Sequence, residues 1–296
     1  MTSVIHDIGY RHYDGKRLGR AYAVRSLFTY NLRAAFGLGR PVKAKIMPFL
    51  LFAIMLMPAA ISVAITAIAA QVGAGQNVNL IRYSAYATYL QPLIAIFLAA
   101  QAPVLASRDL RFHVTPLYFS RPVSRLDYVL AKYTAFTTAL FILLATPVTL
   151  LFVGALVTKQ KHLGTHTVHW LGGVAGCLIY ALVLAGIGLV VAAFTPRRGF
   201  GVTAVMAVYL LSTTAVAAVQ GIAENQTQFT LAQWAGLFAP FNLVDGVQVW
   251  ALHAKQSAPE PPPSGLGGPV FTLVCAALVA GSVAILYLRF RKAGSR

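Results

Sequence analysis

Charged and aromatic residues are concentrated in one stretch of an otherwise apolar chain, from Arg108 to Tyr133. This stretch holds five basic and two acidic residues, and two prolines interrupt it. Arginine and aspartate side chains form charge-assisted hydrogen bonds, and the neighbouring leucines and phenylalanines offer an apolar contact. These residue types favour binding to another protein. The alternative is a basic loop that only contacts lipid headgroups and sets the topology.

Three histidines, His162, His166 and His169, form a second polar cluster. Two histidines four residues apart on a helix can share a metal ion, but no cysteine or acidic residue lies nearby and Gly164 interrupts the helix. We therefore predict a solvated or interfacial loop, and no metal site. The sequence also lacks the phosphate-binding loop, the H-E-x-x-H zinc motif and the G-x-S-x-G elbow. We expect no catalytic residues and no enzyme activity in this chain.

The composition is that of a membrane protein. Hydrophobic residues make up 58% of the 296 residues and charged residues 10%, against about a quarter charged in soluble domains. Charge-free runs reach the roughly 20 residues that cross a bilayer as a helix, and they do not alternate as barrel strands do. We predict an all-α polytopic membrane protein with six transmembrane helices, near 46–70, 83–106, 134–157, 171–194, 201–222 and 270–288.

The basic residues predict the orientation. Twenty of the 24 Lys and Arg residues fall in the segment 1–45, the 107–133 loop, the 197–198 turn and the C-terminal tail. Only Arg82, Lys159, Lys161 and Lys255 fall on the other side. Because basic loops stay in the cytoplasm, we expect a plasma-membrane protein with both termini cytoplasmic and with 71–82, 158–170 and 223–269 outside. The net charge of +17 follows from this topology, so no nucleic-acid partner is needed to explain it.

Three regions are expected. Residues 1–44 form a cytoplasmic tail and an amphipathic helix, residues 45–288 the six-span domain, and residues 289–296 a cytoplasmic tail. Apolar residues at helical spacing predict that the first helix lies in the headgroup plane, and packing on the protein is the alternative. These residues are Val24, Leu27, Phe28, Leu32 and Ala35.

The outer 223–269 segment is too apolar for a solvated loop and too interrupted for a span. Its aromatic residues Trp234, Phe238, Phe241 and Trp250 predict short re-entrant helices in the outer leaflet. The proline-rich part that follows predicts a flexible or extended connector. Cys177 and Cys275 fall inside spans, where small apolar packing is expected.

From Ser120 to Tyr133 the sequence resembles the membrane (permease) subunits of bacterial type-2 ATP-binding-cassette exporters. The family phrase is carried by Phe119-Ser120-Arg121-Pro122-Val123-Ser124-Arg125. Asp109 stands for the acidic residue that precedes the phrase, and Lys132 for the lysine that opens the third span. Where the family often has Gly-Thr-Leu, this chain reads RFHVTPLYF. The resemblance covers the whole chain, from the N-terminal helix to the long outer loop before the sixth span.

The resemblance implies that the 107–133 loop forms a coupling helix seated on a separate ATPase subunit. The coupling residues are then Ser107, Arg108, Asp109, Leu110, Arg111, Phe112 and His113. Asp109 is expected to accept bonds from the ATPase, and Phe112 to be the buried anchor. Arg121, Arg125 and Lys132 are expected to hold the loop against headgroups. The implied partners are two copies of the ATPase, which bind ATP and Mg, and a second permease copy or homologue.

The cargo pathway is expected on spans two and five, which line the central cavity in related transporters. One helical face of each span carries aromatic and polar residues. These residues are Tyr83, Tyr86, Phe97 and Gln101 on span two, and Met206, Tyr209, Thr213 and Gln220 on span five. They suit an amphipathic or hydrophobic cargo such as a natural product, drug or lipid. The alternative is that they bond helix to helix.

Another class of function is an ATP-independent six-span secondary transporter or membrane scaffold. Secondary transporters use buried ionisable groups or broken helices for coupling. Within their predicted boundaries, spans two and five contain no ionisable side chain apart from the tyrosines. This absence disfavours a secondary transporter, and export driven by ATP hydrolysis on another subunit is what the family resemblance implies.

Overall fold

The computed structural model describes residues 15, 18–72, 81–112, 118, 123–158, 163–195 and 197–293. Helices make up its regular structure, and six of the described segments are long and apolar enough to cross a membrane. The predicted all-α architecture with six spans is thus confirmed.

Each of the six spans is built on one long helix. They are α2 (Val42–Gln71), α4 (Gln91–Leu105), α7 (Arg125–Val157), α8 (Leu163–Phe194), α9 (Arg198–Asn225) and α12 (Gly267–Ala293). The short helices are α1 (Arg20–Ala35), α3 (Tyr86–Tyr89), α5 (Ser107–Arg111), α10 (Phe229–Ala235) and α11 (Pro240–Ala251). Helix α5 follows α4 directly after Ala106, and the two together make the second apolar segment, Gln91–Arg111.

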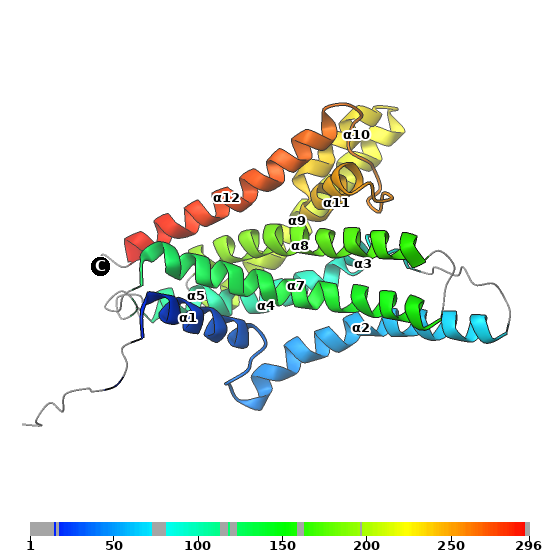
Figure 1. The fold of residues 1–296 in the computed structure, drawn as a ribbon. Coiled ribbons are helices and arrows are strands. Elements are labelled where there is room, and N and C mark those ends of the chain that lie inside the picture. Colours follow the sequence, from blue (N-terminus) through cyan, green and yellow to red (C-terminus); the bar gives the residue numbers. More distant parts are fainter. Residues whose placement is uncertain are drawn as a thin grey trace, which may run out of the picture.

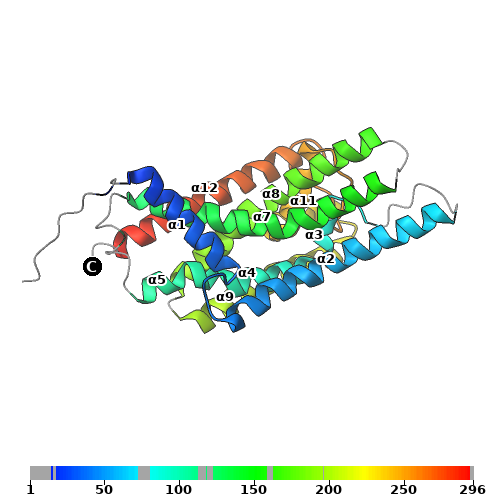
Figure 2. The same ribbon diagram turned by 60° about the horizontal axis from the view of Figure 1, so that its bottom comes forward.

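Helices α7 and α8 run side by side through the centre of the molecule (Figures 1 and 2). Helices α1 and α2 pack on α7, α12 packs on α8, and α9 packs on α4. Glycines allow some of these close approaches: a Cβ on Gly186 would lie 2.6 Å from the Ser282 hydroxyl oxygen, and one on Gly188 would lie 2.8 Å from Leu98. Both cysteines are free and buried in this packing.

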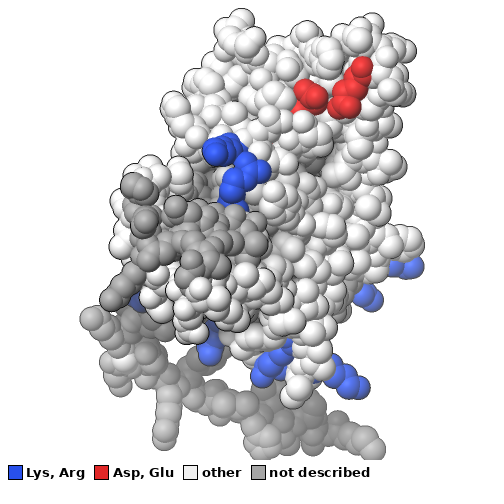
Figure 3. Space-filling model, turned by 90° about the vertical axis from the view of Figure 1, so that its right-hand side faces the viewer, with Lys and Arg blue, Asp and Glu red and all other residues white. Residues whose placement is uncertain are grey.

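Helix α1, helix α5, the start of α7 and the end of α12 lie together at one end of the bundle, at the left of Figure 1. Arginine and lysine residues are frequent in these segments, so we call this end the basic end. Helices α10 and α11 lie towards the opposite end. Viewed from that side, acidic side chains lie near the upper edge of the surface, and Lys and Arg side chains lie near its middle and along its lower part (Figure 3).

Three predicted span starts are wrong. The fourth span begins at Leu163 rather than near 171, so His166 and His169 lie on a helix and not in the predicted loop. The third span begins at Arg125 rather than near 134. Its first nine residues therefore belong to a helix and not to the predicted 107–133 loop. The second span does not begin at 83, because residues up to Leu90 form a turn and the separate helix α3. Pro92 lies in the first turn of α4, a position that tolerates proline because no helical N–H is needed there.

The apolar face of α1 packs on protein. Leu27 and Ala35 are buried in the main core, and Val24, Phe28 and Leu32 pack against it. The prediction that this face points into the headgroup layer is therefore wrong, and the alternative of packing on the protein is correct. The turn to α2 passes through Gly37 and Gly39 with φ of 70° and 82°, a backbone region that glycine adopts without strain.

The 223–269 segment contains the short helices α10 and α11, and their re-entrant position in the outer leaflet stays a prediction. Helix α11 is mostly buried, with Phe241 fully inside the main core. Phe241 therefore packs on protein, whereas Phe238 and Trp250 are exposed. Asp245 is buried on the same helix, and its polar contacts are described below.

Candidate functional site: a short helix at the basic end

Helix α5 is separated from α4 by a local change of backbone direction at Ala106, which has φ of −101° and ψ of −51°. Ser107, the first residue of α5, is buried and donates a hydrogen bond from its hydroxyl to the Ala192 carbonyl of α8 at 2.6 Å. Both ends of this bond are buried, so breaking it leaves an unsatisfied polar group. The start of α5 is therefore fixed to the end of α8.

Asp109 binds two side chains of α7. Its Oδ2 accepts a hydrogen bond from the Tyr128 hydroxyl at 2.6 Å, and it forms an ion pair with the Lys132 ammonium at 2.5 Å. The Lys132 side chain is only 4% exposed, and it also donates to the Leu105 carbonyl. A buried ammonium group is tolerated where acceptors surround it. The pair therefore joins α5, the end of α4 and α7 into one unit.

Aromatic rings complete the surroundings of Lys132. Its Nζ lies 4.8 Å from the centre of the Tyr128 ring and 5.6 Å from the centre of the Phe290 ring. The two rings meet edge to face at 5.2 Å, a favoured geometry for aromatic pairs. Because Phe290 belongs to α12, the sixth span is tied to the same unit.

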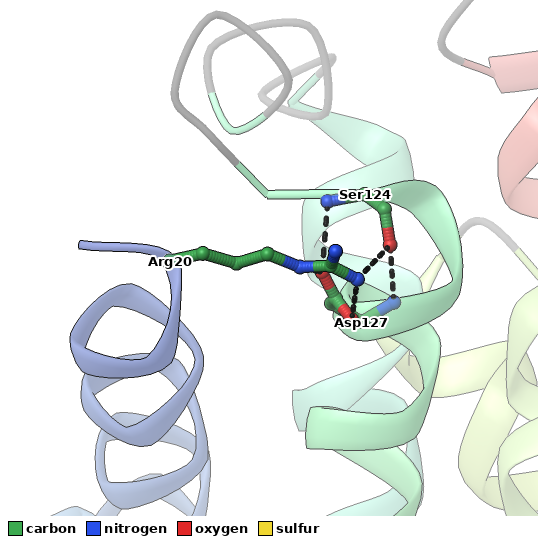
Figure 4. A network of polar contacts seen from close by, with 3 residues as sticks. All are labelled: Arg20, Ser124 and Asp127. Carbon is green, nitrogen blue, oxygen red and sulfur yellow. Dashed lines mark hydrogen bonds and ion pairs between the residues drawn. The ribbon is translucent and has the colours of Figure 1, made fainter.

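The beginning of α7 has its own cap (Figure 4). The Ser124 hydroxyl accepts from the Asp127 N–H at 3.1 Å, and the Asp127 carboxylate accepts from the Ser124 N–H at 3.0 Å. Arg20, at the start of α1, binds both oxygens of Asp127 at 2.7 and 2.8 Å. This capping box explains why α7 begins at Arg125, and the arginine fork connects α1 to it.

The free surface of α5 is formed by Arg108, Arg111 and Phe112. Phe112 is 61% exposed, and the Arg111 guanidinium lies 5.5 Å from the centre of its ring. Leu110 packs against the main core instead. This surface has two cations and one aromatic ring on a helix whose other side is anchored in the bundle.

The predicted coupling residues thus divide into two groups. Arg108, Arg111 and Phe112 face outward, whereas Ser107, Asp109 and Leu110 face the bundle. His113 lies outside the described residues. The Oδ2 atom of Asp109 is occupied by Lys132 and Tyr128, so the carboxylate is only partly available to a partner, and its contact with an ATPase stays a prediction. The expectation that Lys132 contacts headgroups is wrong, because its side chain is buried and paired with Asp109.

The predicted pathway residues of span two lie on two different elements. Tyr83 and Tyr86 precede α4, so they do not share a helical face with Phe97 and Gln101. Tyr86, Phe97 and Gln101 are buried. The Tyr86 hydroxyl donates to the Met55 carbonyl of α2, and burial raises the Tyr86 pKa to about 12. The Phe97 ring lies 6.2 Å from the Phe36 ring.

The predicted residues of span five lie on α9. Met206, Tyr209 and Thr213 are half-buried, and Tyr209 stands edge-on to Phe241 at 5.7 Å. Gln220 is buried and donates to the Ala232 carbonyl of α10 at 3.1 Å. The space between α4 and α9 beside Tyr209 is an apolar cavity of about 20 Å³, which has room for a single water molecule. In the single chain these residues therefore contact helices, and their role in cargo binding stays a prediction.

A buried polar cluster beneath α11 was not predicted. The Asp245 carboxylate accepts hydrogen bonds from the Ser257 and Ala258 N–H groups at 3.0 and 2.8 Å. Arg82 donates to the Gln256 carbonyl at 3.0 Å. Burial raises the pKa of Asp245, and the two N–H groups oppose that rise. The connector after α11 is thus held at its first residues. The signal was a single acidic residue in an otherwise uncharged stretch, Phe241 to Trp250.

The histidines do not assemble a metal site within the described residues. His162 lies outside that part of the chain. His166 is buried and its Nδ1 lies 3.3 Å from the Tyr83 hydroxyl, whereas His169 is exposed. No group of three metal-ligating side chains occurs among the residues that the structure describes.

Comparison with known protein families and with the curated proteins gave no match.

Proposed function

We propose that the chain is the permease subunit of an ATP-driven exporter that moves an amphipathic or hydrophobic substrate out of the cell. Two permease chains pair with two copies of a separate ATPase, which binds ATP and Mg. The resemblance of Ser120–Tyr133 to type-2 ATP-binding-cassette exporters suggests this function, and the six spans are compatible with it.

The observation that carries the proposal is the construction of α5. Phe112 and two arginines are exposed on it, and its inner side is fixed to α7 and α8 by Asp109 and Ser107. Exposed aromatic and arginine residues are the usual anchors of protein–protein contacts. A partner bound at Phe112 therefore moves a rigid unit.

That unit connects to four spans. Helix α5 continues α4, its carboxylate binds α7, its serine binds α8, and Tyr128 packs on Phe290 of α12. A displacement of α5 by the ATPase is thereby passed to the body of the bundle. Helix α9 packs mainly on α4 and is the least buried of the six spans, so it is the span freest to respond or to meet a second chain.

The cargo is proposed to pass along α9. Met206, Tyr209 and Thr213 are half-buried, and Tyr209 supplies an aromatic ring and Thr213 a hydroxyl for an amphipathic molecule. Tyr86, Phe97, Gln101 and Gln220 reach such a molecule only if α9 moves away from its neighbours. A pathway that opens during the cycle is consistent with the closed space between α4 and α9.

The basic end is proposed to face the cytoplasm of a plasma-membrane protein, because basic residues gather there. The ion pair of Asp109 and Lys132 does not favour a secondary transporter. Lys132 is the eighth residue of α7, about 10 Å from its start. It therefore lies near one end of the bundle, away from the midplane where coupling ions bind in secondary transporters.

The test is reconstitution with an ATPase encoded beside the gene. The two chains are co-expressed, purified through a tag on the permease, and placed in lipid nanodiscs. We expect equal numbers of the two chains in the purified complex and ATP hydrolysis that exceeds that of the ATPase alone. If the ATPase neither remains bound nor changes its rate, the proposal is wrong and an ATP-independent function stands.

A further inference from the structure

The outer face of α1 lines a cavity of about 610 Å³ at the basic end. Three segments contribute to it: α1, the turn between α1 and α2, and the start of α5. The residues that line it are Tyr22, Arg25, Ser26, Thr29, Tyr30, Arg33, Ala34, Leu38, Gly39, Arg40 and Arg108. Helix α1 therefore packs its apolar face on the bundle and turns its polar face to this cavity.

Four of the lining residues are arginines, and none of the described residues that line the cavity is acidic. The acidic side chains described at this end are occupied elsewhere, since Asp109 binds Lys132 and Asp127 binds Arg20. Arg25 and Arg33 lie eight residues apart on α1, so they share one helical face with Thr29 between them. Among the described residues, Arg25, Arg33 and Arg108 thus place positive charge around the cavity, and no described carboxylate lines it.

Guanidinium groups bind phosphate oxygens through paired N–H donors. The hydroxyl groups of Tyr22, Ser26 and Tyr30 add further donors around the same space. A phosphate-bearing anion therefore fits the chemistry of the cavity better than a neutral or cationic ligand does.

The position of the cavity indicates the source of that phosphate. Arg40 is followed within two residues by Val42, the first residue of the first span, and Arg108 lies at the end of the second apolar segment. The cavity therefore lies beside the ends of two spans, where lipid headgroups are expected.

An apolar surface begins at the edge of the cavity. Leu38 lines the cavity and is 39% exposed. Val42, Ile46 and Leu50, spaced four residues apart on α2, are also exposed. A molecule with a phosphate group and hydrocarbon chains can place its phosphate among the arginines and its chains along α2. Free phosphate can contact the arginines but makes no use of the apolar surface of α2.

We propose that the cavity binds the headgroup of an anionic phospholipid, with its acyl chains along the start of α2. This site goes beyond the exporter function and does not depend on it. Because Arg108 belongs to α5 and Arg25 to α1, a bound headgroup bridges the two helices. Lipid binding then fixes the position of α5 relative to α1.

The experiment is native mass spectrometry of the whole chain released from nanodiscs that contain palmitoyl-oleoyl phosphatidylglycerol or palmitoyl-oleoyl phosphatidylcholine. The test variant is Arg25→Gln with Arg33→Gln. The matched control is Arg197→Gln with Arg291→Gln, which removes the same charge from exposed positions at the same end. Arg108 is kept, so that a failure of ATPase coupling cannot alter the result.

We expect the unaltered chain and the control to retain phosphatidylglycerol but not phosphatidylcholine, and the test variant to bind phosphatidylglycerol about 30-fold more weakly. Equal retention by test variant and control would overturn the proposal. Displacement of the lipid by millimolar inorganic phosphate would also overturn it, by showing a site for free anions. Unchanged lipid retention with loss of a co-purified acidic protein would assign the cavity to a protein partner instead.

Discussion

The two ends of the molecule each hold an aspartate against the helices, partly buried at one end and buried at the other, and the two carboxylates have different hydrogen-bond partners. At the basic end Asp109 meets the ammonium group of Lys132, a side chain of a long span. At the opposite end Asp245 meets two backbone N–H groups of a connector. The first arrangement joins two helices, and the second holds the proline-rich connector that follows α11.

This difference has a consequence for how each end can move. The basic end is held by an ion pair, a capping box and aromatic contacts that cross α5, α7 and α12. The Asp245 cluster leaves one carboxylate oxygen and the Ser257 hydroxyl without a hydrogen-bond partner among the described residues. Buried unsatisfied polar atoms lower stability, so we expect the connector end to open before the basic end does.

The largest expected effect is that of Lys132→Met. It leaves Asp109 partly buried without its cation, which should lower the free energy of unfolding by about 3–5 kcal/mol. Thermal unfolding of the purified chain in detergent measures this loss. In the double variant Asp109→Asn/Lys132→Met most of the stability should return, because neither charge is then left alone. A single variant as stable as the unaltered chain would show that the pair does not hold the basic end.

Asp245→Ala should have a smaller and more local effect. It removes the acceptor of the Ser257 and Ala258 N–H groups, and such a loss costs about 1–3 kcal/mol for each buried group left unsatisfied. Limited proteolysis should cut the connector between residues 252 and 266 faster than in the unaltered chain. The basic end should stay resistant. Equal cleavage rates in the variant and the unaltered chain would contradict the assigned role of Asp245.

The pH dependence of stability distinguishes the two ends most finely. Burial raises the pKa of Asp245 in the folded chain, so the folded chain takes up a proton at a higher pH than the unfolded chain does. Its stability should therefore rise as the pH falls through that raised value. The gain is complete below the ordinary aspartate pKa of about 3.9, and it is lost again as the pH rises.

The size of this effect is about 1.4 kcal/mol for each unit by which the pKa is raised. The measurement is the difference in melting temperature between the unaltered chain and Asp245→Asn, taken at several values from pH 7 down to pH 4. The difference should shift in favour of the unaltered chain as the pH falls. A constant difference would mean that Asp245 does not titrate between these values.

Much of the fold was predictable because the bilayer imposes it. Runs of apolar residues longer than a span, such as 134–157, are sufficient to locate the helices. The start of α7 was missed although its signal is in the sequence: Ser124 followed three residues later by Asp127 is a capping pattern before an apolar run. Because Arg125 and Lys132 are charged, they favour a polar loop, and the predicted start of the helix at 134 therefore lies nine residues after the observed start.

The site was predicted only in outline for a physical reason. A sequence shows that Asp109 and Lys132 are both charged, but not that they face each other across 23 residues. Sequence reasoning therefore grouped Asp109 with Phe112 as partner contacts and Lys132 with Arg125 as lipid contacts. The structure pairs Asp109 with Lys132, so substitutions at these two positions should behave alike, and Phe112 becomes the residue that tests coupling separately from stability.

The central claim is that a separate ATPase acts on the chain through Phe112. Its most direct test is ATP hydrolysis by the reconstituted complex, measured for Phe112→Ala against Phe200→Ala. Both phenylalanines are exposed, at 61% and 64%. We expect Phe112→Ala to lose ATPase binding by at least about 2 kcal/mol, roughly 30-fold, at an unchanged melting temperature, while Phe200→Ala keeps binding and hydrolysis. If Phe112→Ala binds and stimulates the ATPase as fully as Phe200→Ala does, α5 is not the coupling element.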